Sequence, residues 1–221
     1  MVRETPVLDL EPGALGLPGR LSLKLELLQH TGSFKARGAF NLLLARDVPS
    51  AGVVAASGGN FGLAIAYAAR ALGHSATIFV PEATVEVKRA KLRTLGANLV
   101  VTGAYYADAL AASLEHAQRT GALVAHAYDQ PEVVAGGGVC ALELESQRPR
   151  LDTVLVAVGG GGLIGGVATW YGGRARVISV ESEQTATMAA ALAAGRPVDV
   201  EVSGIAADAL GARRIGDLGF A

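Results

Sequence analysis

Short apolar runs alternate along most of the chain with longer segments whose apolar positions recur every three to four residues. The first pattern predicts β-strands, and the second predicts amphipathic or alanine-rich helices. Short strands that alternate with helices indicate βαβ units and a mostly parallel sheet, and strands that are apolar on both faces indicate helices on both sides. The expected strands are 20–27, 52–57, 76–81, 98–103, 122–127, 151–158 and 175–181, and the expected helices are 33–46, 60–72, 84–95, 105–120, 131–147 and one after the glycines that follow residue 158.

Composition and charge exclude several classes of function. Hydrophobic residues make up 51% of the 221 positions, which is enough for a core without disulfides or metals. Lys plus Arg (19) nearly balance Asp plus Glu (20), so we expect no nucleic-acid partner. We expect no membrane partner either, because every long apolar stretch is interrupted. The N-terminus lacks a signal-peptide pattern, which favours a cytoplasmic location. With the single cysteine Cys140 and no metal-hydrolase spacing among the histidines, we expect no metal site.

The first candidate chemical segment is TGSFKARG at 31–38, which contains Lys35. This lysine is expected one turn into a helix, just after a glycine turn and beside the aromatic Phe34. The helix N-terminus disfavours a charged amine, and a neutral amine is the nucleophile that forms a Schiff base. On the residues alone, a solvated surface lysine is the commoner alternative.

The second segment is SGGNFG at 57–62, between an expected strand and an expected helix. Backbone N–H groups and the Asn60 amide converge at such a junction and can hold an anion such as a carboxylate. A glycine-rich turn in which Asn60 caps the helix explains the same residues.

The third segment is the run Gly159 to Gly162, after a strongly apolar strand and before a helix. Four glycines leave the backbone bare, so several N–H groups can close on a phosphate. The stretch GGGLIG at 160–165 also matches the dinucleotide-binding pattern, with Glu181 at the end of the next strand as the ribose-binding acid. An NAD(P)-dependent oxidoreductase is therefore an alternative of another class.

With TGSFKARG, SGGNFG and VGGGGL in this order, the sequence resembles the fold-type II (tryptophan synthase β-like) pyridoxal phosphate (PLP) enzymes. Among them it is most similar to the serine/threonine dehydratases (threonine ammonia-lyases). The resemblance implies an α/β fold with two lobes of mostly parallel sheet flanked by helices. It implies a large PLP-binding domain at 1–52 and 129–221, a small domain at 53–128 that carries the asparagine loop, and a homo-oligomer, a dimer or tetramer.

The resemblance also implies roles for individual residues. Lys35 would bind PLP as a Schiff base and, with Ser57, would be catalytic. The other implied contacts are Phe34 beside the cofactor ring; Ser57, Gly58, Gly59 and Asn60 around the substrate carboxylate, with Asn60 also on the cofactor; and Gly159, Gly160, Gly161, Gly162 and Leu163 around the phosphate.

The implied reaction is β-elimination of a small hydroxy amino acid, L-threonine or L-serine, to a 2-oxo acid and ammonia. PLP would accept the electrons while Lys35 carries the Cα proton. Serine racemases, the alternative within the family, carry Ser at the position of Gly58 as a proton donor on the second face. Glycine has no side chain to donate a proton, which favours the dehydratase.

The sequence departs from this family at several places. Phe61 stands where the branch usually has His, and Ala-Leu-Gly follows Asp208 where Gly is usual. Glu181 matches one acid of the cation site of some relatives, but Thr187 stands at the second. Relatives continue for roughly another third of this chain, so we expect that the C-terminal part is missing, including the partner of the pyridine nitrogen.

Overall fold

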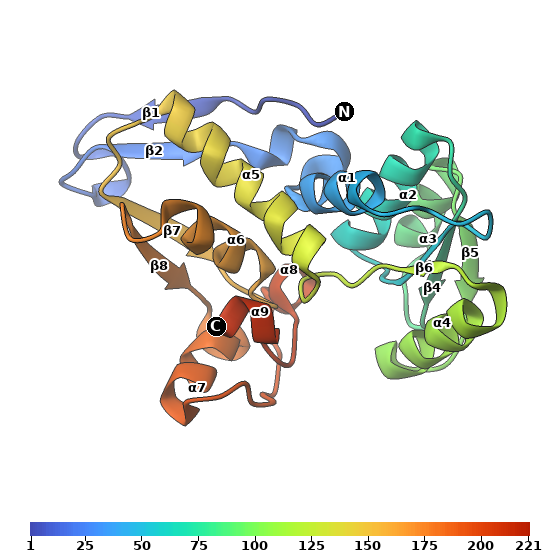
Figure 1. Ribbon diagram of the computed structural model, residues 1–221. Helices are drawn as coiled ribbons and strands as arrows, with labels where there is room; N and C mark the ends of the chain where they lie inside the picture. The colour runs from blue at the N-terminus through green and yellow to red at the C-terminus, as the bar shows by residue number, and fades with distance from the viewer.

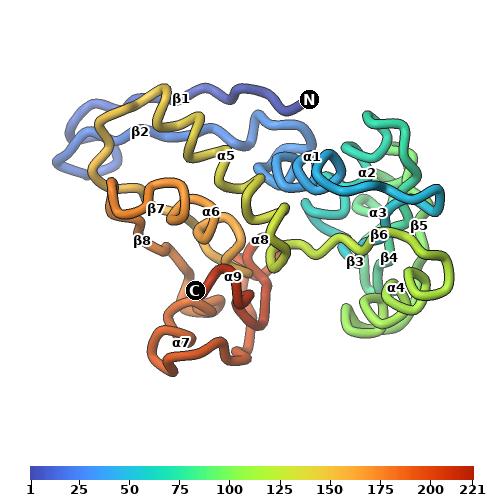
Figure 2. Tube along the Cα trace, viewed as in Figure 1, coloured from blue at the N-terminus to red at the C-terminus, as the bar shows by residue number.

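The computed structural model describes residues 1–221, and Figure 1 shows an α/β molecule with two lobes. The chain begins in one lobe, passes through helix α1 (Lys35–Ala45), builds the second lobe and returns along helix α5 (Pro131–Gln147), as the trace in Figure 2 shows. The expected α/β architecture with sheets flanked by helices is confirmed.

The second lobe contains a parallel sheet with strand order β5-β4-β3-β6. Alternate residues of β3 point to opposite faces, as the strand period of two requires. Val53 and Ala55 join the core beneath helices α1 and α2, whereas Val54 and Ala56 join the core beneath α4. The elements of this lobe are β3 (Val53–Ala56), α2 (Asn60–Leu72), β4 (Ala76–Val80), α3 (Glu86–Thr94), β5 (Asn98–Val101), α4 (Tyr106–Thr120) and β6 (Leu123–Val124).

The first lobe contains two separate two-stranded sheets. Strands β1 (Val7–Leu10) and β2 (Leu21–Lys24) are antiparallel, whereas β7 (Thr153–Ala157) and β8 (Arg176–Val180) are parallel. Helix α5 packs against both α1 and α6 (Gly162–Tyr171). The C-terminal segment folds back onto α6 through short helices, α7 (Thr187–Ala194), α8 (Ala207–Leu210) and α9 (Asp217–Phe220).

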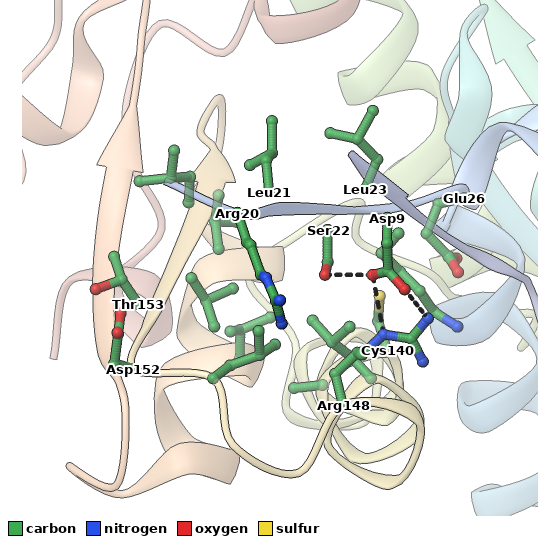
Figure 3. Close-up of a pocket in the computed structure, with 18 of the residues that line it drawn as sticks. Asp9, Arg20, Leu21, Ser22, Leu23, Glu26, Cys140, Arg148, Asp152 and Thr153 are labelled. Atoms are coloured by element: carbon green, nitrogen blue, oxygen red, sulfur yellow. Dashed lines mark hydrogen bonds and ion pairs between the residues drawn. The ribbon is translucent and has the colours of Figure 1, made fainter. Parts of the chain in front are cut away.

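A groove with a volume of about 1090 Å³ separates β2 from β7 (Figure 3). The free edges of the two sheets face each other across it, and it reaches Phe34 and Leu163. At its rim, Asp9 accepts hydrogen bonds from Ser22 and Arg148, which ties the β1–β2 hairpin to the end of α5. The groove therefore divides the sheet structure of the first lobe into two parts.

Most of the expected elements are present, with ends that differ by a few residues. The strand expected over 20–27 ends at Lys24, and a turn of 3₁₀-helix follows at Glu26–Leu28. The strand expected over 122–127 is shorter, at Leu123–Val124, with a last hydrogen bond from the Ala125 N–H to Val54, and the Ala127 carbonyl then accepts a hydrogen bond from Lys35. Helix α1 packs against both α2 and α5, so it lies between the lobes whose boundaries we predict at 52/53 and 128/129. No helix is long and apolar enough to cross a membrane.

Candidate active site

Lys35 is the first residue of α1 and points toward the connection between the lobes. Its Nζ donates a hydrogen bond to the Ala127 carbonyl at 2.6 Å. The same atom lies 5.0 Å from the ring centre of Phe34 and 5.7 Å from that of Phe61. Burial among these groups disfavours the charged amine and lowers the pKa of Lys35 from 10.5 to about 8. The alternative of an ordinary solvated surface lysine does not describe this side chain.

The turn before Lys35 is strained and contains two buried hydroxyls without partners. Thr31 has a φ of 62°, in the left-handed region that a β-branched residue rarely occupies. Thr31 Oγ1 and Ser33 Oγ are buried and form no hydrogen bond within the protein. Strained backbone and unpaired buried polar atoms concentrate where proteins bind ligands. Two hydroxyls that a ligand or water could bind therefore lie two and four residues before Lys35 in the chain.

The asparagine loop connects β3 to α2. Helix α2 begins at Asn60, and the residue at its N-cap is Gly59. The side chain of Asn60 is exposed and forms no hydrogen bond, so it does not cap the helix. Apart from Gly59, whose N–H donates to Ser57 Oγ at 3.3 Å, the N–H groups from Gly58 to Gly62 have no acceptor in the protein. The loop therefore has the free donors that an anion requires.

The glycine loop connects β7 to α6. The N–H groups from Gly159 through Ile164 donate no hydrogen bond within the protein. The loop is also crowded, because a Cβ on Gly160 would lie 2.3 Å from the ring of Tyr128, and one on Gly161 would lie 2.7 Å from Ile215. Glycine is needed here for space and, at Gly161 with a φ of 85°, for backbone conformation. The segment forms a second cluster of free donors at a helix N-terminus.

Two residues that sequence analysis gave no role bring the three motifs together. Ala127 accepts the hydrogen bond from Lys35, and the next residue, Tyr128, packs its ring on Gly160. From the other side, Phe61 of the asparagine loop places its ring beside the Lys35 amine. The Lys35 amine therefore lies between the two loops of free N–H groups. Nothing in the local sequence pattern marks Ala127, because it contributes only a main-chain carbonyl.

Glu181 does not have the environment that the dinucleotide alternative requires. Its carboxylate accepts hydrogen bonds from the N–H groups of Met188 at 2.8 Å and Ala189 at 2.9 Å, and so caps helix α7. A carboxylate engaged in this way is not free to bind a ribose hydroxyl. No group of three or more His, Cys, Asp or Glu side chains is placed to hold a metal ion.

The residues present fit PLP. A partly buried amine of lowered pKa suits the aldehyde, which forms a Schiff base with a neutral amine. The glycine loop has the free N–H groups and the absence of Cβ atoms that a phosphate needs. The asparagine loop leaves a further set of donors for a carboxylate.

Comparisons with known proteins identify the family of this chain. The family model described as pyridoxal-phosphate dependent enzyme matches residues 1–221. The L-threonine ammonia-lyase of Thermotoga maritima is 40% identical over 207 residues, which cover 91% of this chain and 52% of that protein. The processed form of threonine deaminase isoform 2 from Solanum lycopersicum has a TM-score of 0.92 at 30% identity, covering 99% of this chain and 65% of that one. Maize serine racemase has the same TM-score at 32% identity, covering 99% of this chain and 68% of that one.

The chain thus spans about half the length of the curated relative it matches. The match to the family model nevertheless extends over every residue of the chain, including Lys35 and both loops. This chain belongs to the family of pyridoxal-phosphate dependent enzymes.

Proposed function

We propose that this protein is a PLP-dependent dehydratase, an ammonia-lyase that converts a small hydroxy amino acid, L-threonine or L-serine, into a 2-oxo acid and ammonia. The observation that carries the proposal is the partly buried Lys35 amine between two loops of free N–H groups. One loop suits the phosphate of the cofactor, and the other suits the carboxylate of an amino acid. Relatives named for threonine ammonia-lyase and threonine deaminase activity support the same reaction.

In this mechanism Lys35 has two tasks. Its Nζ holds the cofactor and then moves the proton at the substrate Cα, for which a pKa of about 8 is well suited near neutral pH. Bound PLP supplies an electron sink for the pair left on Cα. The rings of Phe34 and Phe61 exclude water from the amine. The proton that Lys35 takes from Cα is available to the β-hydroxyl, which leaves as water, and the unsaturated amino product then reacts with one water to give the 2-oxo acid and ammonia.

We assign binding roles to both loops. The N–H groups of Gly159, Gly160, Gly161, Gly162 and Leu163 hold the phosphate. The asparagine loop orients the amino acid through Ser57, Gly58, Gly59 and Asn60, so that its Cα faces Lys35. Asn60 also contacts the cofactor, and its exposed, unpaired side chain is free to do so. Orientation by such loops lowers the barrier because the reacting groups are already aligned.

Gly58 favours elimination over racemisation. Racemisation needs a proton donor on the face opposite Lys35, and glycine provides none. A Cβ at Gly58 would lie 3.0 Å from Thr84 Cγ2 and 3.2 Å from Thr84 Oγ1. A side chain at residue 58 would therefore require the Thr84 side chain to shift slightly.

The direct test is product analysis of the purified protein with L-threonine and L-serine. We expect a 2-oxo acid and an equal amount of ammonia, and no accumulation of the D-amino acid. The 2-oxo acid is followed with a coupled NADH-dependent dehydrogenase, and the enantiomers by chiral chromatography. A D-amino acid in excess of the 2-oxo acid would assign the racemase alternative, and cofactor binding with neither product would contradict both activities.

The lowered pKa of Lys35 shifts the pH range over which the cofactor is incorporated toward neutral pH. The neutral fraction of an amine of pKa about 8 exceeds that of an ordinary lysine of pKa 10.5 by roughly 300-fold at pH 7. We expect the rate of PLP incorporation into the cofactor-free protein to rise with pH and level off above about pH 8. Stopped-flow absorbance of PLP mixed with the protein measures this profile. A rate that still rises roughly eightfold between pH 9 and pH 10, as expected for an amine of pKa 10.5, would show that the amine is not perturbed.

We also propose a cytoplasmic location and a homo-oligomer, either a dimer or a tetramer. The first is consistent with the amino-acid substrate, and the second is what the family resemblance implies.

A further inference from the structure

The carbonyl groups of Gly159, Gly160 and Gly161 accept hydrogen bonds, whereas the N–H groups of the glycine loop are free. Thr187 Oγ1 donates to the Gly159 carbonyl at 2.6 Å. The Gly216 N–H donates to the Gly160 carbonyl at 3.0 Å, and the Gly165 N–H donates to the Gly161 carbonyl at 2.9 Å. Only the last of these bonds belongs to helix α6 itself. The other two come from segments far along the chain, so tertiary packing sets the direction of the loop peptides.

In a trans peptide the C=O of one residue and the N–H of the next point in opposite directions, and this chain has no cis peptide bond. A carbonyl held on one side of the loop therefore aims the following N–H at the other side. The bond from Thr187 fixes the peptide between Gly159 and Gly160. The Gly160 N–H consequently points away from Thr187 and α7.

Thr187 is itself firmly placed. It is fully buried and is the first residue of α7. Glu181 caps that helix through the N–H groups of Met188 and Ala189 and also lies 3.2 Å from the Thr187 hydroxyl. A hydroxyl has a single hydrogen, and the shorter of its two contacts is the one to Gly159. The end of β8 thus holds α7, and α7 holds the glycine loop.

We propose that Thr187 is a positioning residue for the cofactor phosphate, because its hydroxyl fixes the Gly159 carbonyl and so aims the Gly160 N–H at the phosphate. This inference rests on the assignment of the glycine loop as the phosphate site. Thr187 does not touch the cofactor. Its contribution is that an N–H group of the loop is already oriented before the phosphate arrives, which reduces the cost of binding.

The test compares PLP with pyridoxal, which carries the same aldehyde but no phosphate. Dissociation constants for both are measured by absorbance titration of the cofactor-free wild type and of Thr187→Val, which has nearly the same shape without the donor. We expect Thr187→Val to weaken PLP binding by about three- to tenfold, the usual range for one hydrogen bond, and to leave pyridoxal binding unchanged. Thr187→Ser, which retains the hydroxyl, restores PLP affinity.

The matched control is Thr185→Val. Thr185 is equally buried, but its hydroxyl bonds only to Ser182 and not to the loop. This variant keeps the wild-type ratio of the two dissociation constants. If Thr187→Val does not fold, Thr187→Ala is the second variant without a donor.

The outcomes separate this inference from the proposed function. The positioning role is overturned if Thr187→Val keeps the wild-type ratio of the dissociation constants for PLP and pyridoxal, whether both constants stay the same or both rise equally. In that case the cofactor site still stands. A wild type that binds PLP no more tightly than pyridoxal overturns the assignment of the phosphate loop and the positioning role together.

Discussion

Lys35→Ala is expected to remove the visible absorbance band of the bound cofactor and to lower kcat by about 10³-fold or more. The amine of Lys35 is the group that holds the aldehyde and moves the Cα proton, and loss of a general base alone costs about 10²–10⁴-fold. The groups in contact with the amine, which are the Ala127 carbonyl and the rings of Phe34 and Phe61, cannot form a Schiff base in its place. Absorbance spectra of the reconstituted proteins and the 2-oxo acid assay measure both effects.

The control for this variant is Lys91→Ala. Lys91 is exposed on α3, and its amine takes part in no ion pair or hydrogen bond, so the band and the activity should remain. Thermal unfolding verifies that both variants are folded. A Lys35→Ala protein that keeps the wild-type spectrum would show that another lysine carries the cofactor.

Arg37→Met is expected to destabilise the fold by about 3–5 kcal/mol, the usual cost of breaking a buried ion pair. The Arg37 side chain is completely buried and donates to Glu26 at 2.7 Å and to Glu143 at 2.9 Å. Burial alone would raise the pKa of Glu143, but hydrogen bonds from Arg37 and Lys24 outweigh it and lower that pKa to about 2. Without Arg37, two largely buried carboxylates lose their main partner. Urea denaturation followed by the fluorescence of Trp170 measures the change.

Two further variants test the cause of this loss. Arg93→Ala removes an exposed pair with Glu86 on α3 and should change the free energy of unfolding by no more than about 1 kcal/mol. Combining Arg37→Met with Glu26→Gln removes the carboxylate that is left without a cation, whereas Glu143 keeps its ion pair with Lys24, so this double variant should recover much of the lost stability. No recovery in the double variant would mean that packing, and not charge, is the main contribution of Arg37.

This ion-pair network also explains how α1 is held. Arg37 lies two residues after Lys35 on the same helix, Glu143 lies on α5, and Glu26 follows β2. In the sequence, Arg37 is only part of a motif, and neither glutamate has a predicted role. The two acids are 11 and 106 residues away in the chain, and no local pattern pairs them with the arginine.

The amino-acid sequence by itself determined the succession of strands and helices, because apolar periodicity depends on neighbouring residues. It also located the three motifs, since Lys35 and the two glycine-rich loops lie where strands or turns meet helices. The ends of elements were less predictable. The strand expected over 122–127 stops at Val124 because the chain there turns to present the Ala127 carbonyl to Lys35. A local pattern does not contain that distant requirement.

Only the tertiary structure decided what these motifs can do together. Part of the burial that lowers the pKa of Lys35 comes from Phe61 and Ala127, which lie far from it in sequence but close in space. The tertiary structure also decided that Glu181 caps α7 instead of binding a ribose, and that Thr187 holds the glycine loop. Desolvation and hydrogen-bond direction depend on groups that folding brings together, whereas strand and helix patterns depend on adjacent residues.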